Sequence, residues 1–184
     1  GFLVLGNPNL VAGTALNFDA RFEFYPTAGD VLAVDVFRKN FTNPIVTTIV
    51  LAGEPVVTPA NATSALTTGI EFEAHTGLGF LARSLRGFDI SGNLTLIKSS
   101  VTLPPELGTY PSDLAFQGQS PFLFNVGLSY AAPRPRISAA VLLNGFGDRI
   151  TQYGIQVGQS QNPNIIERSR LTLDAKLQVG LFGG

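Results

Sequence analysis

Hydrophobic and polar side chains alternate along several stretches of the chain, first over residues 17–24. The even positions there are apolar and the odd positions are polar: Phe18, Ala20, Phe22 and Phe24 against Asn17, Asp19, Arg21 and Glu23. A period of two is typical of a β-strand with one apolar and one polar face, because successive side chains point to opposite sides. The same pattern predicts further strands at residues 31–41, 68–74, 88–97, 122–130, 137–144 and 170–180.

The links between these predicted strands are short at one end and long at the other. Residues 26–30 and 131–136 form two short links, and residues 75–87 form an intermediate one. The long links are rich in polar residues or proline and cover residues 53–67, 98–120 and 147–169. This arrangement predicts an all-β fold, an antiparallel up-and-down meander of about seven strands.

Two architectures cover the apolar faces of such strands, and the composition of the chain is compatible with both. Hydrophobic residues make up 45% of the 184 positions, charged residues only 14%, and the mean hydropathy is +0.25. No run approaches the 18 or so apolar residues of a membrane-spanning helix. A transmembrane β-barrel turns its apolar face to lipid, whereas a soluble β-sandwich packs it against a second sheet.

Strand length and the character of the polar positions favour the barrel. Sandwich strands usually span 5–6 residues, whereas several strands here approach about ten residues and the long links reach about fifteen. The polar positions combine charge with small residues: Gly69, Gly127, Ser129 and Ser138. Such a face is typical of a barrel interior filled by water or by a plug. We therefore predict that the meander is part of a larger transmembrane β-barrel.

The alternation assigns the strand residues to two faces. The lipid-facing candidates are large and apolar: Phe18, Phe22, Phe24, Leu32, Val34, Phe72, Phe124, Val126, Leu128, Leu171, Leu173 and Leu177. The lumen-facing candidates carry a charge or an amide: Asp19, Arg21, Glu23, Glu71, Glu73, Asn125, Asp174 and Lys176. Charge pairing between strands is the first role expected of the lumen-facing set, and contact with a plug is the second.

Charge and residue usage exclude several classes of function. Lysine and arginine total 12 against 13 acidic residues, without the basic cluster that binds nucleic acid. The chain has no cysteine, which excludes disulfides, thiolate metal sites and cysteine nucleophiles. His75 is the single histidine, which argues against a zinc site. We expect no cofactor and no metal.

Several short motifs resemble cofactor-binding or catalytic sites but lack the neighbouring structure that such sites require. Residues 77–82, GLGFLA, match the glycine pattern of a dinucleotide site, but the next predicted strand leaves no room for the required helix. Glu71 and Glu73 share a strand face, where paired carboxylates can act as a glycosidase acid and base; inside a barrel they more often pair with basic side chains. Asp148 and Arg149 are expected to form a local ion pair. We predict that the protein is not an enzyme.

Several stretches resemble TonB-dependent outer-membrane receptors, and they occur in the order in which that family carries them. GNPNL (6–10) and NFDARFEFYPTAGDVLAVDVFRKNFTNPI (17–45) resemble a G-N-P-x-L loop and the two strands that follow it. TGIEFEA (68–74) and GNLTLIKSSV (92–101) resemble two further strands.

The later part of the chain continues this resemblance. GQSPFLFNVGLSY (118–130) is the most specific stretch, because it is similar to a segment of Bacteroidota-type receptors. NGFGDRI (144–150) and RLTLDAKL (170–177) continue the series. The resemblance covers nearly the whole chain.

The resemblance implies consecutive strands from the later part of a barrel of about 22 strands that encloses a plug. Such receptors lie in the bacterial outer membrane and import siderophores, vitamins or glycans with energy relayed by TonB. The implied partners are outer-membrane lipid, the rest of the barrel and its plug, the TonB complex and a surface lipoprotein, and the long links would face the cell exterior. Residues 1–184 are then one partial barrel domain that lacks the plug and the remaining strands.

The start of the chain fits that expectation, and two alternatives remain. GFLVLGNPNL carries no signal peptide and no initial methionine, so we expect the sequence to begin inside a longer product. A small barrel closed by an eighth strand from residues 1–10, or by oligomerisation, would serve as a pore or an anchor. A soluble β-sandwich would serve as a carbohydrate-binding module. The unpaired edge of the last strand favours the larger barrel, because lipid does not tolerate open sheet edges.

Overall fold

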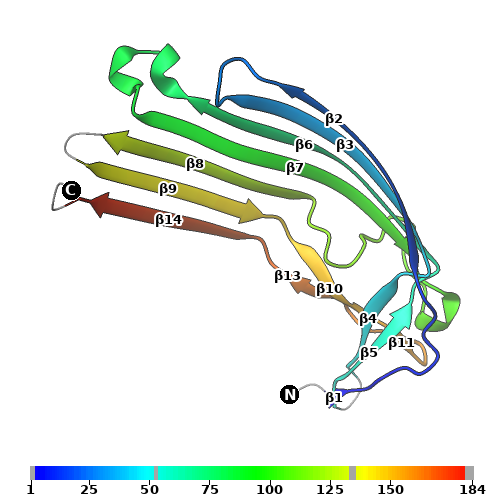
Figure 1. Cartoon of the computed structure of the whole chain (residues 1–184). Helices are drawn as coiled ribbons and strands as arrows, with labels where there is room; N and C mark the ends of the chain where they lie inside the picture. Colours follow the sequence, from blue (N-terminus) through cyan, green and yellow to red (C-terminus); the bar gives the residue numbers. More distant parts are fainter. Residues whose placement is uncertain (1–2, 52–53, 133–135, 181–184) are drawn as a thin grey trace.

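The computed structural model describes residues 3–51, 54–132 and 136–180, and seven long strands dominate it (Figure 1). They are β2 (Thr14–Phe24), β3 (Val31–Thr42), β6 (Ser64–Gly77), β7 (Phe88–Thr102), β8 (Phe122–Ala132), β9 (Ile137–Phe146) and β14 (Arg170–Val179). Each pairs antiparallel with the next, in the sheet order β14-β9-β8-β7-β6-β3-β2. The predicted all-β meander is confirmed.

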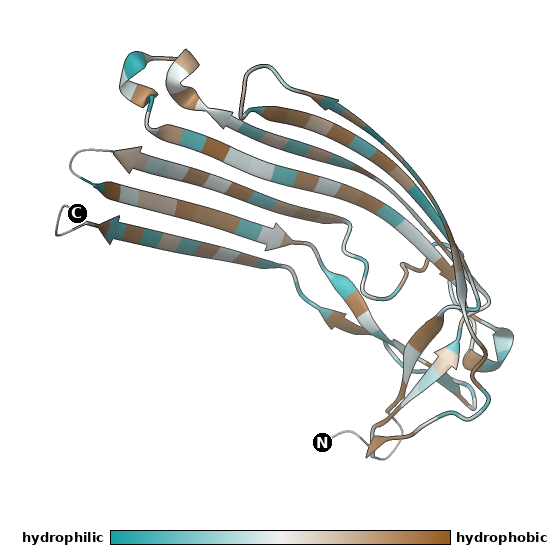
Figure 2. Cartoon of the chain, in the orientation of Figure 1, coloured by the Kyte–Doolittle hydropathy of each residue, from teal (hydrophilic) through white to brown (hydrophobic). Residues whose placement is uncertain are grey.

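The strand register aligns the apolar positions of neighbouring strands on one face of the sheet and the polar positions on the other. Phe22, Val34, Phe72, Leu94 and Phe124 pair in succession from β2 to β8 and form one apolar row. Figure 2 shows the same alternation as bands of opposite hydropathy along each long strand. We call the face that carries this row the outer face and the opposite one the inner face.

The connections at one end of the strands are short, and we call this the turn end. Two single-turn 3₁₀ helices, η1 (Leu78–Phe80) and η2 (Arg83–Leu85), join β6 to β7 there. The GLGFLA stretch therefore belongs to a tight connection. A third helix of this kind, η3 (Pro105–Leu107), lies at the opposite end, which we call the loop end. None of the helices in the described ranges is long and apolar enough to cross a membrane.

The predicted long links were wrong in part, because several of their residues are in strands. Residues 64–67 belong to β6, and residues 98–102 belong to β7. The links also contain strands of their own: β5 (Val56–Asn61), β10 (Arg149–Gly154), β11 (Gln156–Val157), β12 (Ser160–Gln161) and β13 (Ile165–Glu167). A further strand, β4 (Ile45–Val50), lies between the predicted strand at residues 31–41 and the first long link. Strands β6 and β7 continue past Thr68 and Lys98, the outer-face positions where the run of apolar residues is first interrupted.

A second sheet at the loop end has the order β1-β5-β4-β10-β13, where β1 is Leu3–Val4. Strand β10 pairs parallel with β4, with Tyr153 beside Thr48. Strand β1 pairs parallel with β5, with Leu3 beside Val56. The described residues 3–10 therefore do not add an eighth strand to the meander, and the predicted small barrel closed in that way is wrong.

The buried core of the described chain lies at the loop end, between the inner face and the second sheet. Its members are apolar side chains from both parts: Val46, Ala62, Ala65, Val101, Leu103, Leu114 and Tyr153. Phe41 of β3 also packs on this cluster, with its ring centroid 5.2 Å from that of Phe116. We call the second sheet, together with residues 103–121, the cap.

Candidate functional site

All predicted lipid-facing residues lie on the outer face. Except for Phe124, which is half-buried, these side chains are exposed, with Phe22 at 72% and Leu173 at 67%. A contiguous exposed apolar surface of this extent marks a membrane or protein contact. The assignment of this face to lipid remains a prediction at this point.

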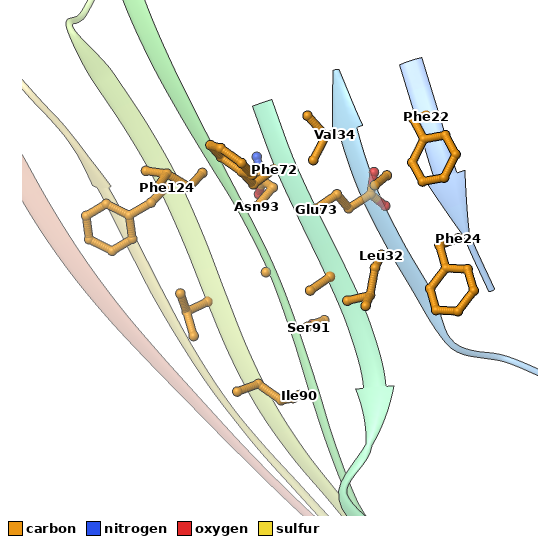
Figure 3. Close-up of a pocket in the computed structure, with 15 residues that line it drawn as sticks. Phe22, Phe24, Leu32, Val34, Phe72, Glu73, Ile90, Ser91, Asn93 and Phe124 are labelled. Carbon is orange, nitrogen blue, oxygen red and sulfur yellow. The ribbon is translucent and has the colours of Figure 1, made fainter. Parts of the chain in front are cut away.

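A hollow of about 930 Å³ lies among the large side chains of the outer face (Figure 3). Phe22 and Phe24 of β2 stand on one side of it and Phe124 of β8 on the other, with Phe72 of β6 between them. Its walls consist mainly of rings and methyl groups. An open hollow with such apolar walls is better suited to acyl chains than to a polar ligand.

Three of the predicted lumen-facing residues form an ion network on the inner face. The Arg21 guanidinium lies 2.7 Å from the Glu73 carboxylate and also donates a hydrogen bond to Glu23. Arg21 is on β2 and Glu73 is on β6, so the bridge passes over Ala33 of the intervening strand β3. Ala33 is only 4% exposed. The Tyr25 hydroxyl donates to Glu23 as well, and this bond raises the pKa of Tyr25.

A polar row crosses the same face of the sheet beside this network. Glu73, Asn93, Asn125 and Asn144 pair in succession from β6 to β9. The Asn125 amide nitrogen donates to the Asn93 side-chain oxygen over 2.8 Å. Asn93 was missed by the sequence analysis, although it occupies a polar position of its predicted strand.

Asp19 and Glu71 line a second hollow of about 300 Å³ on the inner face, together with Asp35, Lys39 and Thr67. Thr67 is 3% exposed, and its hydroxyl has no hydrogen-bond partner among the described residues. The Oδ1 atom of Asp35 is likewise buried without a partner in the described ranges. This hollow therefore offers unsatisfied polar atoms to a polar group outside the described residues.

Phe37 stands at the border between the polar inner face and the cap. It pairs with Gly69, and a Cβ atom at Gly69 would collide with the Phe37 ring. The ammonium of Lys39 lies 5.4 Å from the centroid of the same ring. Gly69 thus leaves space for the Phe37 ring. It is also one of the small residues of the inner face.

Asp174 and Lys176 lie on the inner face but far from the other candidates in the sheet order. Both are on β14, which forms the edge opposite β2. They pair in register with Leu142 and Ala140 of β9, and both are exposed. The structure does not bring them to the Arg21 network.

The predicted ion pair between Asp148 and Arg149 is wrong. Arg149 lies 2.7 Å from Glu167, and Asp148 lies 2.7 Å from Arg168. The backbone N–H of Ser169, followed by Arg168, holds the pKa of Asp148 below its ordinary value of 3.8. Adjacent residues in extended backbone point their side chains in opposite directions, so they pair with residues of the returning strand instead.

The inner face offers little for catalysis or metal binding. Within the described ranges, no group of three or more histidine, cysteine or acidic residues has an arrangement that could hold a metal ion. Glu73, one member of the proposed acid pair, is already bound to Arg21. His75 lies on the inner face near the turn end, between Val31 and Ser91 in register.

Comparisons with known proteins identify the family and the fold. A family model described as TonB dependent receptor-like, beta-barrel matches residues 1–180. A search of curated protein sequences finds no match.

Solved structures share the fold over 97% of this chain. One is the FrpB iron transporter from Neisseria meningitidis in its apoprotein form, with a TM-score of 0.59, 14% identity and 26% of that chain covered. Another is a mutant ferric enterobactin receptor, PfeA, from Pseudomonas aeruginosa in complex with enterobactin, with a TM-score of 0.60, 17% identity and 25% covered. The chain spans about a quarter of the length of these structures. At such identity the likeness establishes the fold alone.

Proposed function

The chain belongs to the TonB-dependent receptor β-barrel family of the bacterial outer membrane, and from this membership we propose that it is part of a nutrient receptor. This family consists of transporters and not of enzymes. The proposed cargo is a siderophore, a vitamin or a glycan-type nutrient. The observation that carries the proposal is the family match over residues 1–180, on a meander that has one mainly apolar face and one mainly polar face.

We propose that residues 1–184 are one partial barrel domain, completed by further strands and by a plug. The edge strands β2 and β14 each have one neighbour in the seven-stranded sheet. In lipid, an unpaired edge leaves backbone N–H and C=O groups without partners, at several kcal/mol for each group. Coverage of only about a quarter of the solved receptors supports the same proposal.

The outer face then lies in lipid, and the inner face contacts the plug. Asp19, Arg21, Glu23, Glu71 and Glu73 are the proposed plug contacts at one edge of the sheet. Asn125, Asp174 and Lys176 would continue that surface toward the other edge. The unpartnered polar atoms of Asp35 and Thr67 support a polar neighbour in the lumen.

We propose that the cap faces the cell exterior, where it contributes to ligand capture or contacts a surface lipoprotein. Long loops on the external side and short turns on the periplasmic side are the rule for outer-membrane barrels. The segment 118–130 supports a receptor of the Bacteroidota type. The energy would come from the TonB complex through the plug.

Uptake by the source bacterium tests the proposal. We expect deletion of the complete gene to abolish uptake of one radiolabelled nutrient from a panel of ferric siderophores, cobalamin and oligosaccharides. An uncoupler that collapses the proton gradient should abolish the same uptake in the parent strain. Uptake that survives the uncoupler would instead indicate a passive pore. Release of the protein from membranes by carbonate would indicate a soluble binding module.

A further inference from the structure

The outer face of the seven-stranded sheet carries only two charged side chains among its described strand residues, and both are cations. They are Arg38 on β3 and Lys98 on β7. The inner face, by contrast, carries acids and bases on most strands. Two like charges on an otherwise uncharged surface need an explanation, since each is unfavourable next to lipid chains.

The two cations occupy one row of the sheet. Arg38 pairs with Thr68 of β6, and Thr68 pairs with Lys98. One strand separates them, so their backbones are about 9–10 Å apart, two inter-strand spacings. Both side chains are long and flexible enough to converge on one group above Thr68.

This row forms the border of the apolar band. On β6, Ile70, Phe72 and Ala74 lie between Thr68 on the loop-end side and Thr76 on the turn-end side. The two threonines are eight residues apart, which corresponds to about 26 Å along the strand. In the next row toward the loop end, Asn40 and Ser100 are polar and alternate with Leu16 and Leu66 of the neighbouring strands. Arg38 and Lys98 therefore stand where hydrocarbon gives way to headgroups.

Neither cation has a carboxylate partner in the described part of the chain. The Arg38 guanidinium donates one long hydrogen bond, 3.3 Å, to the Asn40 side chain. Lys98 lines a hollow that also includes Asp113 and Asp148, but Asp148 is already bound to Arg168 at 2.7 Å. Both cations are exposed and available to an anion from outside the chain.

We propose that Arg38 and Lys98 together bind the phosphate group of an anionic membrane lipid in the leaflet at the loop end. Arginine presents a fork of donors that matches two phosphate oxygens, and lysine adds a point charge. The Thr68 hydroxyl lies between them in the row. The neighbouring Phe18, which pairs with Arg38, supplies an apolar surface for the lipid chain. This inference rests on the proposed membrane position of the outer face.

Lipid retention by the complete receptor tests the inference. We would reconstitute it in nanodiscs that contain phosphatidylglycerol, release it, and count bound lipids by native mass spectrometry. The double variant R38Q/K98Q should bind phosphatidylglycerol about 30-fold more weakly than the wild type, and each single variant about 5-fold more weakly. Phosphatidylcholine, which carries no net charge, should be retained weakly by all forms.

Two matched variants separate this site from general effects of charge and folding. K39Q removes the neighbouring cation, which lies on the inner face, and should leave phosphatidylglycerol binding unchanged. R38K/K98R keeps both charges and should bind within about 2-fold of the wild type. Heat-modifiable gel mobility verifies that each variant is a folded barrel.

The inference is overturned if folded R38Q/K98Q binds phosphatidylglycerol as tightly as the wild type, or if K39Q weakens binding equally. Failure of nutrient uptake in the parent strain, with the lipid result intact, would count against the proposed cargo and leave the lipid site standing.

Discussion

The two ends of β3 have opposite polarity on the same backbone, and so do the two ends of β7. Near the turn end of β3, Val34 is on the outer face and Asp35 is on the inner face. Near its loop end, Asn40 is on the outer face and Phe41 packs on the cap core. The period of two is unchanged, but the apolar side has changed over. The difference teaches that the apolar side can change while a strand continues, and on the proposed lipid assignment of the outer face this change marks the limit of the membrane.

The two halves are consequently stabilised by different surroundings. At the loop end, burial against the cap removes apolar side chains from water, as in the core of a soluble protein. At the turn end, the protein itself leaves the large apolar side chains exposed, and on the proposed assignment of the outer face they depend on lipid. Substitutions in each half should therefore respond to different conditions.

The largest effect is expected from Tyr153→Ala in the cap core. Tyr153 is 0% exposed, and its hydroxyl donates to the Ala115 carbonyl over 2.8 Å. Truncation should lower the free energy of cap opening by about 3–5 kcal/mol, because it leaves a large cavity. Hydrogen exchange of the complete protein should speed up in β4 and β10 but not in β2.

Tyr153→Phe is the matched control, since it removes the hydrogen bond and keeps the ring. It should lower the free energy of opening by only about 1 kcal/mol. Equal effects of the two substitutions would mean that burial of the ring is not what holds the cap.

A charge in the middle of the outer face should have the next largest effect. Leu94→Arg places a cation between Phe72 and Phe124 and should destabilise the complete barrel in lipid by about 2–4 kcal/mol. Ser91→Arg on the same strand is the control, because Ser91 is an exposed inner-face residue. Urea unfolding in vesicles measures both; equal losses would contradict the assignment of the faces.

The smallest effect is expected at Asp148, which joins the start of β10 to the segment before β14. Its folded pKa is lowered, so its contribution to stability is present above about pH 4 and is lost as the pH falls through the folded value. Asp148→Asn should remove that acid-dependent part of cap stability. Exposed Asp113→Asn is the control, and hydrogen exchange across an acid pH series measures both.

The meander was predictable because each long strand alternates and pairs with its neighbour in sequence. The outer-face positions of Phe22, Leu32 and Leu173 followed directly from the period of two. The predicted boundaries were wrong because we took the loss of apolar outer residues as the end of a strand. Thr68 and Lys98 pair with each other inside the sheet, so their polarity does not mark a turn.

The partners in the cap and in the ion network were less predictable. Tyr153 packs beside Thr48 through a parallel pairing that no local pattern reveals. Arg21 reaches Glu73 only because the intervening Ala33 has a small side chain. Asp148 and Arg149 are adjacent in the sequence, which suggested an ion pair, but the extended backbone points their side chains in opposite directions. Contacts of this kind depend on the arrangement of the whole sheet.

The parallel pairing of β4 with β10 has a consequence for the order of folding. The seven long strands can associate in succession, since each needs only the hairpin partner that precedes it. The β4–β10 pair joins segments roughly 100 residues apart, and the chain passes through four long strands, β6 to β9, between them. If the strands associate in chain order, we expect the cap to close only after β9 has joined the sheet, so that a closed cap would indicate an assembled sheet from β2 to β9.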